Sequence, residues 1–341
     1  MRRLALLCAL IFAVAAPAAP GASSAQDADQ RLALRDADLV LEGTTARLVA
    51  VGTGGAATLA WRVPPESTLR AAVGNRRGFA AAGTVRVGGG RDLLLYVGDE
   101  TGARRIAPPP SAARVRDWPV LLMGHLGLAG VAWLEGSDET SLAVRAARWN
   151  GAGWDAVETL APGGAGSQLA LTGARLADGS WLLAWSAFDG EDDEILWSRS
   201  RADGWTLPAR VAPDNHVPDV TPVLAPLGEG AVVAWSHYDG HDYRVVAARF
   251  DGVRFAAPRE IGPAGSVEPE LDGRGDRAVL LYRNVLPAEW RAVELDRTGR
   301  AGAFAAARAR DPERPALRLL EHGAELLWRS GAESLSFQGL P

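Results

Sequence analysis

The chain has 341 residues and a formal net charge of −5 at pH 7, with 41 acidic residues against 36 basic ones. Such a balance does not favour nucleic acid or an anionic membrane surface as a partner. Every basic residue is arginine, which excludes a Walker A lysine, a Schiff-base lysine and a Ser-Lys pair. Cys8 is the only cysteine, so an intramolecular disulfide and a zinc–thiolate cluster are excluded as well.

Residues 1–25 have the pattern of a secretory signal peptide. Two arginines precede an apolar run from Leu4 to Ala16, and small residues follow as far as Ala25. The run is shorter than the roughly 20 apolar residues that a spanning helix needs, although a short membrane anchor is the alternative. We therefore expect a secreted or periplasmic (cell-envelope) protein without stable membrane insertion after cleavage. Residues 26–341 are expected to form a single, monomeric domain.

A short apolar run that ends on a large aromatic residue recurs seven times along the rest of the chain. The aromatic residues are Trp61, Tyr96, Trp133, Trp185, Trp235, Tyr282 and Trp328, and neighbouring ones are 35 to 52 residues apart. Recurrence at this spacing is typical of a repeat architecture.

The repeat is clearest where residues 179–205 are laid over residues 230–255. Each segment alternates strands with Asp-Gly turns, and Asp-Gly is a strong hairpin signal because glycine accepts the positive φ that tight turns require. A preceding strand begins near a proline, as at Pro222 and Pro269. Four short antiparallel strands per unit are the blades of a β-propeller, in which one large aromatic residue per blade fills the wedge between neighbours.

We therefore expect an all-β fold, a propeller of four-stranded antiparallel blades. Counting the aromatic residues as the ends of second strands gives seven blades; six is the alternative, because the first two intervals are short. The last unit shows strands at Glu325–Trp328 and Ser334–Phe337. An N-terminal strand such as Ala37–Leu41 is expected to complete this unit and close the ring, which would remove exposed sheet edges.

The hairpins that close several units resemble the Asp-box of sialidase-like (BNR-repeat) propellers. An acidic residue, a glycine and a following aromatic residue occur at Ser200–Trp205 and again at Arg249–Phe255. The copies are degenerate, because the family motif is Ser-x-Asp-x-Gly-x-Thr-Trp. The segment Trp61–Pro64 is also similar to that family's Arg-Ile-Pro motif, although the repeat already accounts for this strand. The resemblance implies a propeller fold and, in its hydrolase members, an arginine that holds an anionic sugar.

An arginine directly follows the repeat aromatic residue in the first, sixth and seventh units. These residues are Arg62, Arg283 and Arg329. Because the three units are neighbours in a closed ring, the guanidinium groups are predicted to converge on a carboxylate or another anion, which paired arginine donors match. Ion pairs with local acids such as Glu325 or Asp276 are the alternative.

Acidic residues gather in the loop after the fourth aromatic residue. Asp189, Asp192 and Asp193 lie there within five positions. Solvated turn acids are the commoner meaning of such a loop, and a calcium site is the alternative because calcium prefers oxygen ligands. No other cofactor is expected.

The sequence contains no Gly-x-Ser-x-Gly elbow and gives no indication of a Ser-His-Asp set, so no catalytic residue is nominated. The pattern favours an exported, non-catalytic propeller that binds a glycan, a peptide or a partner protein through one charged face. Two alternatives stay open: a sialidase-like glycoside hydrolase that acts on an anionic sugar, and a scaffold in a cell-envelope assembly.

Overall fold

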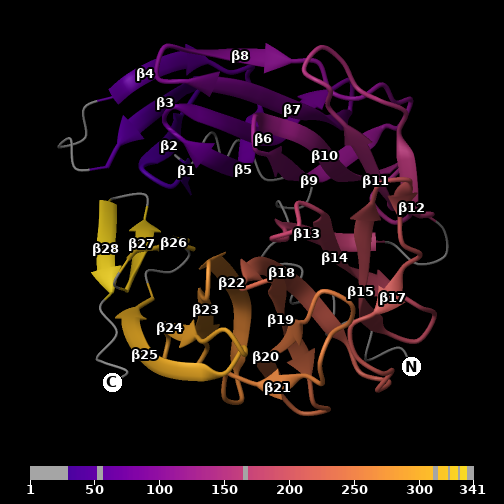
Figure 1. Cartoon of the computed structure of the whole chain (residues 1–341), viewed down its shortest axis with the longest axis vertical. Helices are drawn as coiled ribbons and strands as arrows, with labels where there is room; N and C mark the ends of the chain where they lie inside the picture. The colour runs from indigo at the N-terminus through magenta and orange to yellow at the C-terminus, as the bar shows by residue number, and fades with distance from the viewer. Residues whose placement is uncertain are drawn as a thin grey trace.

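The structure is a computed structural model. It describes residues 30–51, 57–163, 168–309, 314–321, 323–328 and 331–335, so the expected signal peptide lies outside the described residues. Regular structure in these residues consists of β-strands, arranged as a ring of antiparallel sheets (Figure 1). This arrangement confirms the all-β propeller predicted from the repeat. No helix in this part of the chain is long and apolar enough to cross a membrane.

The described strands form six sheets, and the eight-stranded one is joined in its middle by a single parallel pair, Arg91 with Val115. Division of that sheet at this pair gives seven consecutive groups, called units 1 to 7 below. Unit 1 contains β1 (Gln30–Ala33), β2 (Ala37–Glu42), β3 (Thr45–Ala50) and β4 (Ala57–Arg62). Unit 2 contains β5 (Ser67–Asn75), β6 (Gly78–Val87), β7 (Gly90–Asp99) and β8 (Gly102–Ile106). Unit 3 contains β9 (Val115–Gly124), β10 (Gly127–Gly136), β11 (Ala143–Arg148) and β12 (Glu158–Ala161).

Unit 4 contains β13 (Gln168–Arg175), β14 (Trp181–Phe188), β15 (Asp193–Arg201), β16 (Gly204–Trp205) and β17 (Ala209–Arg210). Unit 5 contains β18 (Asp219–Leu227), β19 (Gly230–Tyr238), β20 (Tyr243–Phe250) and β21 (Arg259–Glu260). Unit 6 contains β22 (Ser266–Arg274), β23 (Arg277–Asn284), β24 (Glu289–Leu295) and β25 (Ala301–Arg308), and unit 7 contains β26 (Ala316–Leu319), β27 (Ala324–Trp328) and β28 (Gly331–Leu335). Within each unit, antiparallel neighbours follow chain order, except that β16 and β17 both pair with β15.

The Asp-Gly turns form as predicted between the second and third strands of units 4 and 5. Gly190 has a φ of 118° and Gly240 a φ of 94°, a region that glycine enters without steric cost. In both turns the preceding aspartate accepts backbone hydrogen bonds; Asp239, for example, accepts from the amides of His241 at 2.9 Å and Asp242 at 2.8 Å. The two hairpins therefore have the same local geometry and register.

The core consists of apolar clusters, each between two neighbouring units. Trp185 of unit 4 is fully buried in the cluster shared with unit 3, and Trp235 of unit 5 is 1% exposed in the cluster shared with unit 4. Trp133 and Trp328 are likewise buried in the clusters between units 2 and 3 and between units 6 and 7. These positions confirm that the repeat aromatic residues fill the wedges between neighbours.

The strand numbering predicted for the first two aromatic residues is wrong. Trp61 lies on β4, the fourth strand of unit 1, and Tyr96 lies on β7, the third strand of unit 2. Their rings still pack together across the boundary between the units, with centroids 5.9 Å apart. Several strands of a stacked blade are buried on both faces, so an apolar run that ends on an aromatic residue does not reveal which strand it is. This shift explains the two short intervals.

The strand predicted to complete the last unit is also placed differently. Residues Ala37–Leu41 belong to β2, which pairs with β1 and β3 inside unit 1, so that prediction is wrong. Short turns on both sides give β2 its partners locally. Units 1 and 7 instead lie side by side (Figure 1), and Arg318 of β26 donates hydrogen bonds to the carbonyls of Leu34 and Ala37, each at 3.0 Å.

Candidate functional site

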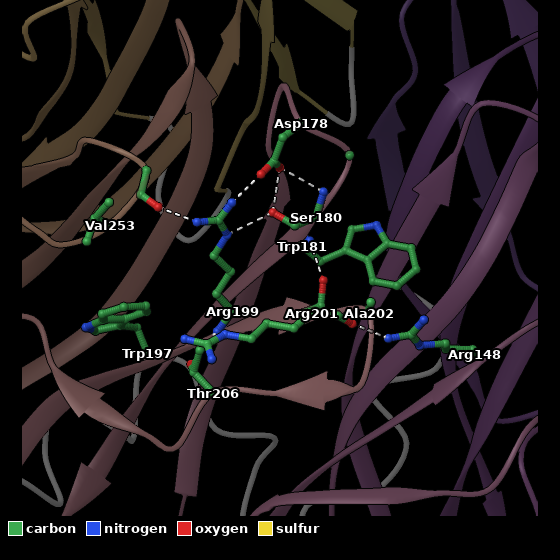
Figure 2. Close-up of a pocket in the computed structure, with 13 residues that line it drawn as sticks. Arg148, Asp178, Ser180, Trp181, Trp197, Arg199, Arg201, Ala202, Thr206 and Val253 are labelled. Atoms are coloured by element: carbon green, nitrogen blue, oxygen red, sulfur yellow. Dashed lines mark hydrogen bonds and ion pairs between the residues drawn. The ribbon is translucent and has the colours of Figure 1, made fainter.

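A cavity of about 710 Å³ opens at the end of unit 4 where the β13–β14 turn and the β15–β16 turn lie (Figure 2). Three units contribute to it: Arg148 ends β11 of unit 3, residues 178–181 and strand β15 belong to unit 4, and Gly252 and Val253 lie in unit 5. This volume is in the range of small-molecule binding sites.

Two half-buried tryptophans supply the flat apolar walls of the cavity. Trp197 makes edge contacts with Phe250 and Phe255 of unit 5, at centroid distances of 5.2 and 5.7 Å. Trp181 is held at its backbone, whose amide donates to the hydroxyl of Ser200 at 2.8 Å. The walls are therefore positioned by packing and hydrogen bonds before any ligand arrives.

Arg199 organises the polar side of the cavity (Figure 2). Its guanidinium donates to the hydroxyl of Ser180 at 3.0 Å, to the carboxylate of Asp178 and to the carbonyl of Gly252. Hydrogen bonds from Ser180, and then the charge of Arg199, keep the pKa of Asp178 below its usual value, so this carboxylate is ionised. Arg199 thus ties the β13–β14 turn of unit 4 to the hairpin of unit 5.

Two further arginines, Arg148 and Arg201, line the cavity, and few acidic groups offset their charge. Arg148 donates to the backbone carbonyl of Arg201 at 2.7 Å. In the part of the chain that the structure describes, neither Arg148 nor Arg201 forms an ion pair. The cavity lining thus carries three guanidinium groups and one carboxylate, Asp178. This charge imbalance favours an anionic group in the cavity.

Two of the arginines predicted from the repeat, Arg62 and Arg283, are not among the residues that line this cavity. Arg62 is exposed at the end of β4 and donates to the hydroxyl of Thr44 at 2.9 Å. Arg283 lies on β23, 3.9 Å from the carboxylate of Glu268. Arg62 is not equivalent to Arg283, because Arg62 lies on a fourth strand and Arg283 on a second one. Arg329 lies outside the described residues, so convergence of the three residues stays a prediction.

Carboxylates gather at the opposite end of unit 4. Asp189, Asp192, Glu194 and Asp214 each place one oxygen within 4.8 Å of the others. Asp193, which the sequence analysis grouped with Asp189 and Asp192, is not a member of this cluster. Asp214 lies in the connection between β17 and β18, and no motif in the sequence points to it.

Burial is the largest cause of raised carboxyl pKa values at this end of unit 4. It raises the pKa of Glu194 to about 7, with the charge of Asp219 as the second cause. It also raises the pKa of Asp193 to about 6, with the charge of Asp192 next. Arg210 contacts the outer members of the group and forms ion pairs of 2.6 Å with both Asp189 and Asp214.

The raised pKa of Glu194 predicts a pH dependence of stability. Between its unfolded pKa of 4.5 and its folded pKa of about 7, the folded chain binds more protons than the unfolded chain. Stability of the chelator-treated protein is therefore expected to fall as the pH rises through this interval. Urea unfolding across the interval measures the slope, which should be shallower in Glu194→Gln. An equal slope in the variant and the parent would contradict the assignment.

No protein-family model matches the chain, and no curated protein is similar to it. Among solved structures, Kluyveromyces lactis Hsv2 is 12% identical with a TM-score of 0.58, covering 91% of this chain and 93% of that one. A prolyl endopeptidase is 14% identical with a TM-score of 0.51, covering 89% of this chain but 45% of its own, so the chain spans less than half of that enzyme. A fungal lectin from Aleuria aurantia with a six-bladed β-propeller fold is 12% identical, with a TM-score of 0.48 and coverage of 85% and 94%. At these identities the similarity concerns the fold alone.

Proposed function

We propose that the protein is an exported, non-catalytic binding module, a seven-bladed propeller related in fold to the sialidase-like propellers. Its ligand is a glycan that carries a carboxylate, and the binding site is the cavity of unit 4. The observation that carries this proposal is the lining itself, in which two tryptophans and three arginines surround about 710 Å³ with a single acid.

The lining matches the chemistry of an acidic sugar. A half-buried indole such as that of Trp181 or Trp197 offers an apolar face on which the C–H side of a sugar ring can pack. Paired donors of a guanidinium match the two oxygens of a carboxylate, and Arg148 and Arg201 form no ion pair that would compete within the described residues. Hydroxyl groups from Ser180 and Thr206 add hydrogen-bonding partners for sugar hydroxyls.

The lining gives less support to the hydrolase hypothesis. A sialidase-like mechanism needs a tyrosine nucleophile with acidic partners, and no tyrosine is among the described residues that line the cavity. Tyr96 and Tyr282, at the repeat positions, are each 3% exposed in the core. No residue is therefore nominated as a catalyst.

Calorimetric titration with D-glucuronate and D-glucose tests the proposal, because the two sugars differ only in the carboxylate. Wild-type protein is expected to bind glucuronate at least tenfold more tightly than glucose. Arg148→Gln and Arg201→Gln are each expected to weaken glucuronate binding by about 10- to 100-fold, the value of a charged hydrogen bond.

Arg86→Gln is the matched control, because this side chain is 70% exposed and lies outside the cavity lining. It should leave binding unchanged. Equal affinity for the two sugars would refute the role of the carboxylate. Failure of glucuronate-containing oligosaccharides to bind would refute the acidic-glycan function itself.

A further inference from the structure

We propose that Asp189, Asp192, Glu194 and Asp214 bind one calcium ion at the end of unit 4 opposite the cavity. The ion would connect the β14–β15 turn, which carries Asp189 and Asp192, to the chain segment that leads from β17 to β18. It would therefore hold unit 4 against the start of unit 5.

The first argument is that the carboxyl groups of Asp192 and Glu194 are buried and have oxygens without hydrogen-bond partners. Asp192 is 7% exposed, and both of its carboxylate oxygens are buried without a hydrogen-bond partner. Glu194 is 1% exposed, and its Oε1 atom is likewise buried and without a partner. Buried charges in proteins are paired or coordinate metals, because an isolated one is strongly disfavoured. Both side chains offer oxygens to the same cluster.

The second argument is geometry and charge. Two oxygens that each lie about 2.4 Å from one calcium ion are at most about 4.8 Å apart, and the four oxygens of the cluster satisfy this limit. Arg210 forms ion pairs with the outer residues Asp189 and Asp214, and the imidazole of His216 lies 3.5 Å from the carboxylate of Asp214. When a bound cation keeps all four carboxylates ionised, they and the one guanidinium leave three negative charges. An all-oxygen set with this charge suits calcium rather than a softer metal.

The third argument is the equivalent hairpin of unit 5, where an arginine side chain neutralises part of the carboxylate charge. Asp239 and Asp242 stand where unit 4 has Asp189 and Asp192, but Arg244 stands where unit 4 has Glu194. Arg244 forms an ion pair of 2.7 Å with Asp239. Unit 5 therefore carries its own positive charge in this hairpin, whereas unit 4 has a further carboxylate at that position.

Thermal unfolding of the full chain, stripped with chelator and then titrated with calcium chloride or magnesium chloride, tests the proposal. Calcium at about 100-fold above its dissociation constant should raise the unfolding midpoint by about 5 °C, and magnesium should have a smaller effect. Calorimetry should give one calcium ion per chain. Glu194→Gln and Asp192→Asn should both lose the calcium shift.

Two variants separate ion binding from a purely structural role. Asp242→Asn changes the equivalent residue of unit 5, and it should keep the full calcium shift. Glu194→Arg copies the arrangement of unit 5, so it should unfold at a higher midpoint than chelated wild type and ignore calcium. The proposal is overturned if calcium does not shift the wild-type midpoint, or if Glu194→Gln shows the same shift and stoichiometry as wild type.

Discussion

Replacing Trp185 with alanine is expected to destabilise the protein by about 3–5 kcal/mol. The indole is fully buried between units 3 and 4, and its Nε1 donates to the side chain of Gln168 at 2.7 Å. Alanine would leave a cavity between two sheets that contact each other chiefly through side chains, and it would remove a hydrogen bond to a buried amide. Urea unfolding followed by circular dichroism measures the loss.

A graded series shows whether packing is the cause. Trp185→Phe keeps most of the apolar volume but loses the donor to Gln168. Its free energy of unfolding should therefore lie between that of the parent and that of Trp185→Ala. Leu126→Ala is the control, because this side chain is fully exposed and its truncation should change stability by no more than about 0.5 kcal/mol. A cost for Trp185→Ala as small as that of the control would refute the wedge role of the aromatic residues.

The sequence predicts the propeller well because the repeat is a packing requirement. A wedge between blades needs a large flat side chain, and Trp133, Trp185 and Trp235 occupy the same place on second strands. The same pattern misnumbers the strands of Trp61 and Tyr96, since burial on both faces looks alike on any inner strand. The sequence also does not determine the partners of β2. An apolar strand near the N-terminus can pair either with its own neighbours, as β2 does, or with the last unit.

The candidate cavity depends on residues that depart from the repeat. Trp181 and Trp197 have alanines, Ala231 and Ala247, at the corresponding positions of unit 5. Comparing the two units for such differences would have indicated the site, whereas searching for a shared arginine position selected Arg62. The repeat shows which residues every blade needs for packing. The candidate cavity lies where unit 4 differs from unit 5.

Replacing Arg318 with leucine is expected to cost about 3 kcal/mol or more and to loosen the contact between units 1 and 7. Arg318 is 4% exposed, and its guanidinium contacts Asp38, which is 3% exposed, as well as the carbonyls of Leu34 and Ala37. No strand pairing joins the first described sheet to the last, so side-chain contacts such as these connect the two. Leucine would leave Asp38 with Arg31 as its remaining cation and would leave two carbonyls without this donor.

The location of the effect matters as much as its size. Hydrogen exchange of Arg318→Leu should accelerate first in β1, β2 and β26, while β14 and β19 keep their protection, because units 1 and 7 would separate from each other before the inner units do. Arg318→Lys should recover part of the stability, since an ammonium keeps the charge but cannot reach all the acceptors of a planar guanidinium. Arg47→Leu is the matched control, because Arg47 forms an exposed ion pair with Glu42 in the same sheet, and its loss should cost less than about 1 kcal/mol. If Arg318→Leu is no less stable than this control, the ring is held by apolar packing alone and the buried arginine has another role.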